Sequence, residues 1–335
     1  MYKIKLAVIG AGGIARNMHL PSISQIDDFD LVAICDLIEE KAVAMAEKYS
    51  IPNVYTNYIE MIEKEDLDAI YILTEPDQIF RIARTALLSN LHVFVEKPAG
   101  ITSFQTKTLA KISKEQGKIL QVGMNRRYIP LVQEVIKKMK AVTEITQVEG
   151  TFVKNDSAYF YGGCADSYIC DAIHTIDLMS YVINSQVVSA ATAVQKIDSD
   201  IDNCWHSVMK FENNVVGILK SNYKAGGRVH SFEFHGPGAS AFVDLGFAGK
   251  SCSAKILYSK GKSFSISSVG AGAFENEELD GKKIANSDDY YNYYGYFYES
   301  VGFAKCIKTG EKPLSDISDA VKSMQLAEFL LENKI

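Results

Sequence analysis

The first 125 residues alternate short apolar runs with amphipathic segments. Five runs are apolar and rich in β-branched residues, and we expect each to be a strand: Ile4–Ile9, Leu31–Cys35, Ala69–Leu73, His92–Val95 and Ile119–Val122. Four segments between them have helical spacing: Ile14–Ile26, Glu39–Tyr49, Gln78–Leu88 and Ser103–Gln116. Strands that are apolar throughout are typical of parallel sheets buried on both faces. The alternation predicts an α/β domain with a doubly wound parallel sheet and right-handed crossovers.

The pattern changes after about Gly123. Gly150–Lys154 has the pattern of a strand, and Cys170–Ile183 has that of an amphipathic helix. From Val187 to Ser267 extended runs are separated by turn signals, the last of them at Ser259–Lys262, a spacing that favours a mostly antiparallel sheet. Two helical patterns follow, Asn292–Thr309 and Ile317–Asn333. This half is predicted to be an α+β domain with one large sheet.

The length of 335 residues favours two domains, which we place at 1–124 and 125–335. A net charge of −6 without a basic stripe argues against nucleic acid as a partner. No apolar run approaches the roughly 20 residues that a membrane span needs, and the N-terminus has no signal-peptide pattern. Six cysteines are scattered without C-x-x-C pairs: Cys35, Cys164, Cys170, Cys204, Cys252 and Cys306. We therefore expect free thiols in a cytoplasmic protein.

A large sheet covered by helices on one face must do something with its other face. Such a face commonly packs on another sheet, so we expect a homodimer or homotetramer formed through the C-terminal sheet. The alternative is a polar face left in contact with water.

The first candidate site is a glycine turn directly after the first predicted strand. Gly10-Ala11-Gly12-Gly13-Ile14-Ala15 leads into a helical pattern, and Asp36 ends the next apolar run. A turn without side chains lets the backbone approach a pyrophosphate, while the helix N-terminus favours negative charge. The Asp36 carboxylate can accept hydrogen bonds from ribose hydroxyls and would repel a 2′-phosphate, which favours NAD over NADP. The alternative is a turn that serves only strand-to-helix packing.

The second candidate is Glu96-Lys97-Pro98, at the carboxyl end of the fifth predicted strand. Ligands of open α/β sheets bind beyond this edge. A lysine before proline is held extended, and its X–Pro bond has an appreciable chance of being cis. Lys97 can therefore donate a proton or hydrogen bond to a substrate oxygen. The alternative is a solvated lysine at the end of a strand.

The third candidate is the run Asp171, His174 and Asp177, which helical spacing places on one face. Histidine is readily poised as a base near neutral pH, and a carboxylate can orient its ring. The same spacing is compatible with a solvent face or a metal pair. We expect no metal, because a dehydrogenase that uses a lysine needs no Lewis acid.

Together these motifs resemble the glucose–fructose oxidoreductase/inositol dehydrogenase (Gfo/Idh/MocA) family over nearly the whole chain. The matching residues are Gly10–Ala15, His19-Leu20-Pro21, Asp36, Thr74-Glu75-Pro76, Glu96-Lys97-Pro98, Arg127-Tyr128 with Pro130, and His174–Asp177. The resemblance implies an N-terminal Rossmann domain and a C-terminal domain whose open sheet mediates oligomerisation. It also implies a nicotinamide lying between Lys97 and His174.

The resemblance assigns roles to individual positions. The cofactor-binding residues are Gly10, Gly12, Gly13, Ile14, Ala15, Asp36, Thr74, Glu75, Pro76, Glu96 and Lys97. Lys97, His174 and Asp171 are the catalytic candidates, and Arg127, Tyr128 and His174 are the substrate-binding ones. Arg127 and Tyr128 have the alternative of bracing the domain junction. The Tyr290–Tyr298 run is interpreted mainly as helix packing, with a sugar site as the alternative.

One departure from the family pattern concerns the catalytic aspartate. Many family members carry it four residues before the histidine, a position held here by Cys170, whereas Asp171 is three before. One residue turns a helical side chain by about 100°, so Asp171 is expected either to assist differently or to hold structure only.

The function predicted is hydride transfer between NAD and a secondary alcohol of a sugar, inositol or related polyol. Two alternatives stay open: a glycosidase that uses NAD transiently, and a non-catalytic nucleotide-binding sensor. The segment Lys154–Asp166 is expected to border the substrate but has no signature that identifies it.

Overall fold

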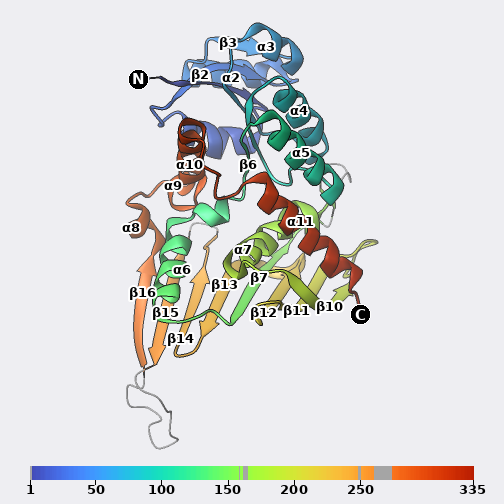
Figure 1. Cartoon of the computed structure of the whole chain (residues 1–335), viewed down its shortest axis with the longest axis vertical. Helices are drawn as coiled ribbons and strands as arrows, with labels where there is room; N and C mark the ends of the chain where they lie inside the picture. Colours follow the sequence, from blue (N-terminus) through green and yellow to red (C-terminus); the bar gives the residue numbers. More distant parts are fainter. Residues whose placement is uncertain (1, 158, 161–164, 248–249, 260–273) are drawn as a thin grey trace, which may run out of the picture. The chain divides into compact units, whose positions relative to one another are not determined.

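A computed structural model describes residues 2–157, 159–160, 165–247, 250–259 and 274–335 (Figure 1). Contacts within the chain divide it into two compact units. The first consists of Met1–Tyr128, Tyr159–Cys170 and Tyr290–Gln325, and the second of Ile129–Ala158, Asp171–Asp289 and Leu326–Ile335. The C-terminal helical segment thus belongs partly with the N-terminal sheet. The boundary between residues 124 and 125 stays a prediction.

The first unit is built on a six-stranded parallel sheet with the order β3-β2-β1-β4-β5-β6. Its strands are β1 (Ile4–Ile9), β2 (Phe29–Cys35), β3 (Asn53–Tyr55), β4 (Ala69–Ile72), β5 (His92–Val95) and β6 (Leu120–Val122). β1, β4 and β5 are almost entirely buried, as their apolar runs indicated. The predicted doubly wound parallel sheet is confirmed.

Helical segments connect these strands and extend the unit. They are η1 (Ala15–His19), α1 (Leu20–Ile23), α2 (Glu39–Tyr49), α3 (Tyr58–Lys64), α4 (Pro76–Leu88), α5 (Ser103–Gln116), η2 (Asn125–Tyr128), α9 (Tyr290–Tyr293) and α10 (Tyr296–Thr309). α10 packs on η1 and α1. Phe303 of α10 joins the core, with its ring centroid 5.6 Å from that of Tyr71 and 5.9 Å from that of Phe94.

Two predicted helices of this unit were wrong in detail, and β3 and α3 are among the elements that were missed. Ile14–Ile26 is a π-helical segment followed by a single α-helical turn that ends at Ile23. Asn292–Thr309 is interrupted by Gly295, whose φ of +93° breaks the helix between α9 and α10. β3 and α3 were not predicted, because the three half-buried residues of β3 form no apolar run.

The second unit contains an eight-stranded sheet with the order β10-β11-β12-β7-β13-β14-β15-β16. Its strands are β7 (Gln147–Asn155), β10 (Val187–Gln195), β11 (Cys204–Phe211), β12 (Val216–Asn222), β13 (Lys224–Gly236), β14 (Ala239–Asp244), β15 (Ser253–Ser259) and β16 (Phe274–Asp280). Among the strand pairs of this sheet that the structure describes, β7–β12 is parallel and the others are antiparallel, so the predicted mostly antiparallel sheet is confirmed. Beyond Ser259, the turn predicted at Ser259–Lys262 lies outside the described residues.

Helices α6 (Pro130–Val142) and α7 (Ile173–Ile183) cover one face of this sheet. α7 lies on β7 and β12, while α6 lies on β14 and β15 (Figure 1). Gly150 of β7 allows a close approach, because a Cβ there would lie 2.4 Å from Thr175 of α7. A residue with a side chain at position 150 would therefore displace α7.

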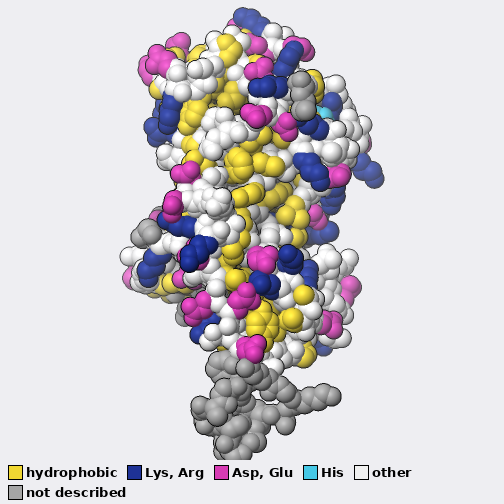
Figure 2. Space-filling view, turned by 90° about the vertical axis from the view of Figure 1, so that its left-hand side faces the viewer, with side chains coloured by type: hydrophobic (Ala, Val, Ile, Leu, Met, Phe, Trp, Pro, Cys, Tyr) yellow, Lys and Arg dark blue, Asp and Glu magenta, His cyan; other side chains and the backbone are white. Residues whose placement is uncertain are grey.

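The remaining elements are β8 (Tyr159–Phe160), β9 (Ala165–Asp166), η4 (Tyr168–Ala172), α8 (Gly281–Ala285) and α11 (Ile317–Glu332). Among the helices of the described ranges, none combines the length and apolarity that crossing a bilayer requires. On the face drawn in Figure 2, basic and acidic side chains are interspersed rather than gathered into a field of one sign.

Candidate functional site

The predicted cofactor residues follow the carboxyl ends of β2, β1, β4 and β5, four neighbouring strands of the first unit. The sheet order reverses between β1 and β4, and this is the edge at which open α/β sheets bind ligands. The last residue of β1 is bonded to the residue after β4, since the Leu73 N–H donates to the Ile9 carbonyl at 2.8 Å.

The glycine turn has a shape suited to a pyrophosphate. Gly10 has a φ of +98°, and a Cβ there would lie 2.6 Å from the Leu73 carbonyl oxygen, so only glycine fits. Around Gly12 and Gly13 a Cβ would meet nothing within 4 Å, which leaves the backbone open to approach. The Arg16 N–H donates to the Gly12 carbonyl at 3.0 Å, so the helical turn begins at the glycines. Ile14 and the buried Ala15 form its first residues.

Asp36 lies directly after β2 with its carboxylate fixed by the backbone. Oδ2 accepts from the Ala11 N–H at 2.7 Å, and Oδ1 accepts from the Ile38 N–H at 2.9 Å. The carboxylate thus ties the glycine turn to the end of β2, where a ribose of a dinucleotide is expected.

The turn after β4 carries Thr74, Glu75 and Pro76. Thr74 is half-buried, Glu75 is exposed, and Pro76 begins α4. All three lie at the predicted edge, and their contact with a cofactor stays a prediction.

Glu96, after β5, points into the protein. Its Oε1 lies 2.7 Å from Nε2 of the fully buried His19, and its Oε2 accepts from the Lys97 N–H at 3.1 Å. Burial raises the pKa of Glu96, but His19 and Lys97 outweigh it and hold the pKa below its usual value. These contacts support a role for Glu96 in fixing the segment that carries Lys97.

Lys97 is half-buried and precedes Pro98 through a cis peptide bond. Its ammonium donates a hydrogen bond to the backbone carbonyl of Cys170, also in the first unit. Cys170 holds the position that many family members give to aspartate, and His174 follows it by four residues. Lys97 is therefore bonded to the segment that leads into the predicted histidine.

In the second unit, Asp171 forms an ion pair that the sequence did not suggest. Its Oδ2 lies 2.6 Å from Nζ of Lys154, which also lies 2.8 Å from the Asp156 carboxylate. Lys154 is 6% exposed and Asp171 is 8% exposed. Burial and the charge of Asp171, which also hydrogen-bonds Tyr223, raise the pKa of Tyr223.

His174 and Asp177 are buried in α7, at 4% and 0% exposure. Thr175, between them, has its hydroxyl 3.1 Å from Nε2 of His230 on β13. Since Asp171 is also buried, these residues do not form a solvent face, and that alternative is wrong.

A metal could be held elsewhere in the second unit, by Glu149, Glu233 and His235. Ligand atoms of these three residues on β7 and β13 lie within 4.8 Å of one another. Lys220 already neutralises Glu149 from 2.9 Å, and Nδ1 of His235 lies 2.9 Å from the Ser240 hydroxyl. The group is thus stabilised by protein partners.

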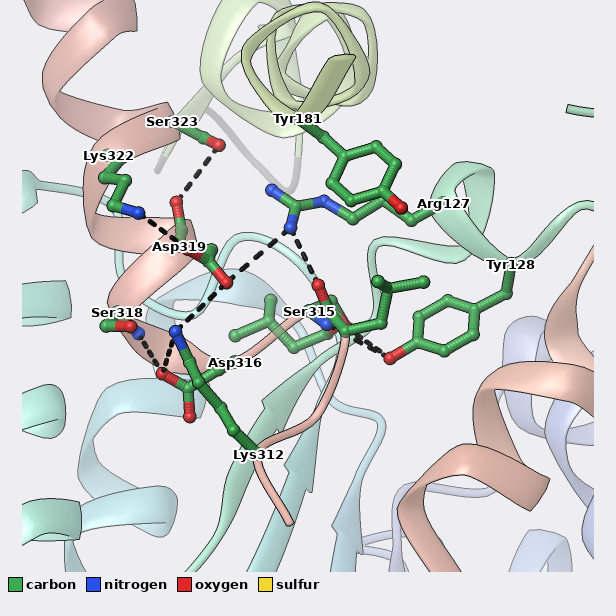
Figure 3. A network of polar contacts seen from close by, with 12 residues as sticks. Arg127, Tyr128, Tyr181, Lys312, Ser315, Asp316, Ser318, Asp319, Lys322 and Ser323 are labelled. Carbon is green, nitrogen blue, oxygen red and sulfur yellow. Dashed lines mark hydrogen bonds and ion pairs between the residues drawn. The ribbon is translucent and has the colours of Figure 1, made fainter. Parts of the chain in front are cut away.

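Arg127 and Tyr128 contact the segment before α11 (Figure 3). The Arg127 guanidinium donates to the Leu314 carbonyl at 2.8 Å and lies 3.8 Å from the Asp319 carboxylate. The Tyr128 hydroxyl accepts from the Ser315 N–H at 3.1 Å. These partners all belong to the first unit. The substrate role and the alternative of bracing the domain junction therefore both stay predictions.

The tyrosine run lies mostly in the interior of the first unit. Tyr293, Tyr294 and Tyr296 are buried, and the rings of Tyr290 and Tyr294 stack with centroids 4.6 Å apart. The Arg126 guanidinium lies 5.0 Å from the Tyr294 ring centroid. This arrangement supports the interpretation as packing.

Comparisons with known proteins agree with this geometry. Residues 4–124 match the family model described as "Oxidoreductase family, NAD-binding Rossmann fold". An uncharacterized oxidoreductase, YrbE, of Bacillus subtilis is 25% identical over 67% of this chain and 68% of its own length. Myo-inositol 2-dehydrogenase of Thermotoga maritima is 24% identical over 66% of this chain and 69% of its own. A dehydrogenase structure from Chromobacterium violaceum has a TM-score of 0.86 at 20% identity, covering 100% of this chain and 96% of that one.

The sheet order, the glycine turn and the family match define an oxidoreductase with an NAD-binding Rossmann domain. The match of residues 4–124 to this model confirms the resemblance to the Gfo/Idh/MocA family that the motifs indicated.

Sequence reasoning missed two features of these sites. The first is the His19–Glu96 pair, which joins positions 77 residues apart. The second is Lys154. The sequence does contain a signal for this residue, because Lys154 continues the alternating set of buried positions of β7, after Val148, Gly150 and Phe152. A lysine on the apolar phase of a strand must be paired.

Proposed function

We propose that the protein is an NAD-dependent dehydrogenase that oxidises a secondary alcohol of a sugar, an inositol or a related polyol. The observation that carries this proposal is the hydrogen bond from Lys97, at the carboxyl end of β5, to the Cys170 carbonyl. It attaches the ammonium to the segment that continues into His174. Several similar proteins are named as inositol dehydrogenases, which supports the substrate class.

In this proposal, Gly10, Gly12 and Gly13 admit the cofactor pyrophosphate, and Asp36 takes the adenosine ribose. Bound NAD supplies the hydride acceptor. Lys97 donates a hydrogen bond to the substrate oxygen, and His174 takes the hydroxyl proton. Both act on charge that develops during transfer, where stabilisation accelerates a reaction most.

The test is a substrate screen with purified protein and NAD, followed by absorbance of NADH. The panel contains myo-inositol, scyllo-inositol, D-glucose, a methyl glucoside and UDP-N-acetylglucosamine. We expect turnover of at least one, and losses of about 10²-fold or more in kcat for Lys97→Ala and His174→Asn. Both variants should retain NAD binding. Turnover that survives both substitutions would overturn the proposed roles.

We further propose that the protein forms a homodimer or homotetramer through the open face of the eight-stranded sheet, in the cytoplasm. Support for the interface comes from one cross-strand row on that face, in which the exposed Val208 and Phe242 flank Ile218, Glu149 and Glu233. Support for the compartment comes from Cys35, Cys204 and Cys306, which are buried free thiols.

A further inference from the structure

Lys154 is a buried cation at a position where a strand normally carries an apolar residue. It lies near the end of β7, on the face that α7 covers. Its ammonium is 5.1 Å from the ring centroid of Tyr223 and 5.8 Å from that of Phe152. A lysine in such surroundings needs counter-charges, and these are Asp156 and Asp171.

The two counter-charges differ in what they are attached to. Asp156 follows β7 closely in the chain, so its pair with Lys154 is local. Asp171 lies in the π-helical turn η4, one residue before the end of that turn and three before His174. The Lys154–Asp171 pair therefore joins the strand to the start of α7.

Other contacts fix α7 on the same sheet. Gly150 lets Thr175 approach β7, and Thr175 is 3.1 Å from His230 of β13. Both contacts lie one residue beyond His174, while the Lys154–Asp171 pair lies before it. The turn that carries the imidazole is thus held from both sides.

We propose that Lys154 is a positioning residue for His174: its ammonium holds Asp171, and Asp171 fixes the helical turn from which the imidazole projects. This inference rests on the proposed role of His174 as the proton acceptor. The inference also makes Asp171 the partner of Lys154. The position four residues before His174, where many family members carry an aspartate, is Cys170 in this chain.

The test compares Lys154→Met, Lys154→Arg, Asp171→Asn and the Lys154→Met/Asp171→Asn double variant. The control is Lys138→Met, which removes another partly buried lysine–carboxylate pair of this unit, Lys138–Glu277 at 2.9 Å. For each variant, kcat and KM are measured on the panel member that wild type turns over fastest. NAD affinity and the thermal midpoint are measured alongside.

Lys154→Met should lower kcat on the order of 10²-fold, because small misplacements of a catalytic group cost that much. Its NAD affinity should stay at the wild-type value. Lys154→Arg should recover part of kcat. The double variant should regain the thermal midpoint, since the carboxylate that still lacks its lysine, Asp156, has a side chain that is 48% exposed. Its kcat should stay at the level of Lys154→Met. Lys138→Met should keep wild-type kcat.

A second readout is independent of turnover. The chain has six histidines, and His174→Asn assigns the ring signals of His174 in a ¹⁵N-histidine NMR spectrum. Lys154→Met and the double variant should shift these signals, whereas Lys138→Met should not. A folded Lys154→Met protein with wild-type kcat and unshifted His174 signals would overturn the inference. A His174→Asn protein with wild-type turnover would instead overturn the proposed function.

Discussion

At the residue scale, Asp36 and Lys97 lie at the same sheet edge but have different partners. Asp36 is bonded to backbone N–H groups of the glycine turn and of the chain after β2, so it belongs to the predicted cofactor site at that turn. Lys97 is bonded to the Cys170 carbonyl, on the segment that precedes His174. Their contributions to binding and turnover should therefore separate.

Asp36→Ala should weaken NAD binding by roughly 10- to 100-fold, because hydrogen bonds to a charged group contribute about 1.5–3 kcal/mol. Lys97→Ala should leave the dissociation constant of NAD nearly unchanged and lower kcat instead. Titration calorimetry with NAD, and steady-state rates at saturating NAD, measure the two effects. Equal and large losses of NAD affinity in both variants would contradict this division.

How far the sequence predicts these residues depends on how local their partners are. The glycine turn and Asp36 could be predicted, because their signals are local: the glycines directly follow one apolar run, and the aspartate ends the next. The partners of Glu96 and Asp171 could not be predicted, because His19 and Lys154 approach these carboxylates only when separate segments of the chain fold together. Arg127 was ambiguous for the same reason: its contacts are 187 and 192 residues further along the chain.

At the element scale, α10 brings a buried acid, Glu299, into the core of the first unit. The residue is fully buried, and neither carboxyl oxygen has a hydrogen-bond partner among the described residues. Burial, together with the charge of Glu96, raises the pKa of Glu299 well above its ordinary 4.5, although Arg126 opposes the shift. The folded protein thus holds Glu299 as the neutral acid at a pH where the unfolded chain has lost the proton.

This shift predicts a pH-dependent stability. Above pH 4.5 the folded state binds more protons at Glu299 than the unfolded state, so stability falls as pH rises toward the folded pKa. The slope is at most about 1.4 kcal/mol per pH unit. Glu299→Gln lacks this contribution, and its advantage over wild type in urea unfolding should grow between pH 5 and pH 8. Glu47→Gln, at an exposed position of α2, is the control. A difference that is constant with pH would contradict the account.

The start of α11 is stabilised by charges around Asp319 (Figure 3). Burial raises the pKa of Asp319, but Lys322, Arg127 and Lys312 outweigh it and hold the pKa below its usual 3.8. The carboxylate therefore contributes stability that is fully present above pH 3.8 and is lost as pH falls through the lower folded pKa.

Asp319→Asn should destabilise the protein by about 1–3 kcal/mol at pH 7, and the loss should shrink as the pH falls below 3.8. The control is Asp288→Asn, which removes an ion pair to Lys282 whose aspartate side chain is 92% exposed. It should cost about 0–1 kcal/mol. Equal losses from the two variants in urea unfolding would argue against a stabilising role for the charges around Asp319.

At the scale of the whole molecule, the second unit exposes one face of an eight-stranded sheet. Val208 is 55% exposed and Phe242 is 39% exposed in the cross-strand row described above. If this face joins copies of the chain, the Val208→Asp/Phe242→Asp double variant should have a mass near 37.0 kDa by light scattering, and wild type a multiple of it. Val43→Asp, on α2 of the first unit, is the control and should keep the wild-type mass. A monomeric wild type would contradict the proposed interface.

Fold class was predictable at this scale because periodicity separates the two sheets. Buried parallel strands such as Val93–Val95 are continuously apolar, whereas β7 alternates. The assignment of residues 290–325 to the first unit could not be predicted. The helical pattern around Phe303 would be the same whichever hydrophobic core this residue joined.

The central proposal is that Lys97 and His174 act on one substrate oxygen beside a bound nicotinamide. A crystal structure with NAD and the best substrate of the panel tests it most directly. The account predicts the pyrophosphate at Gly12 and Gly13, with Lys97 Nζ and the His174 imidazole both within about 3.2 Å of the reacting oxygen. A nicotinamide bound away from Lys97, or a His174 ring remote from the substrate, would contradict it.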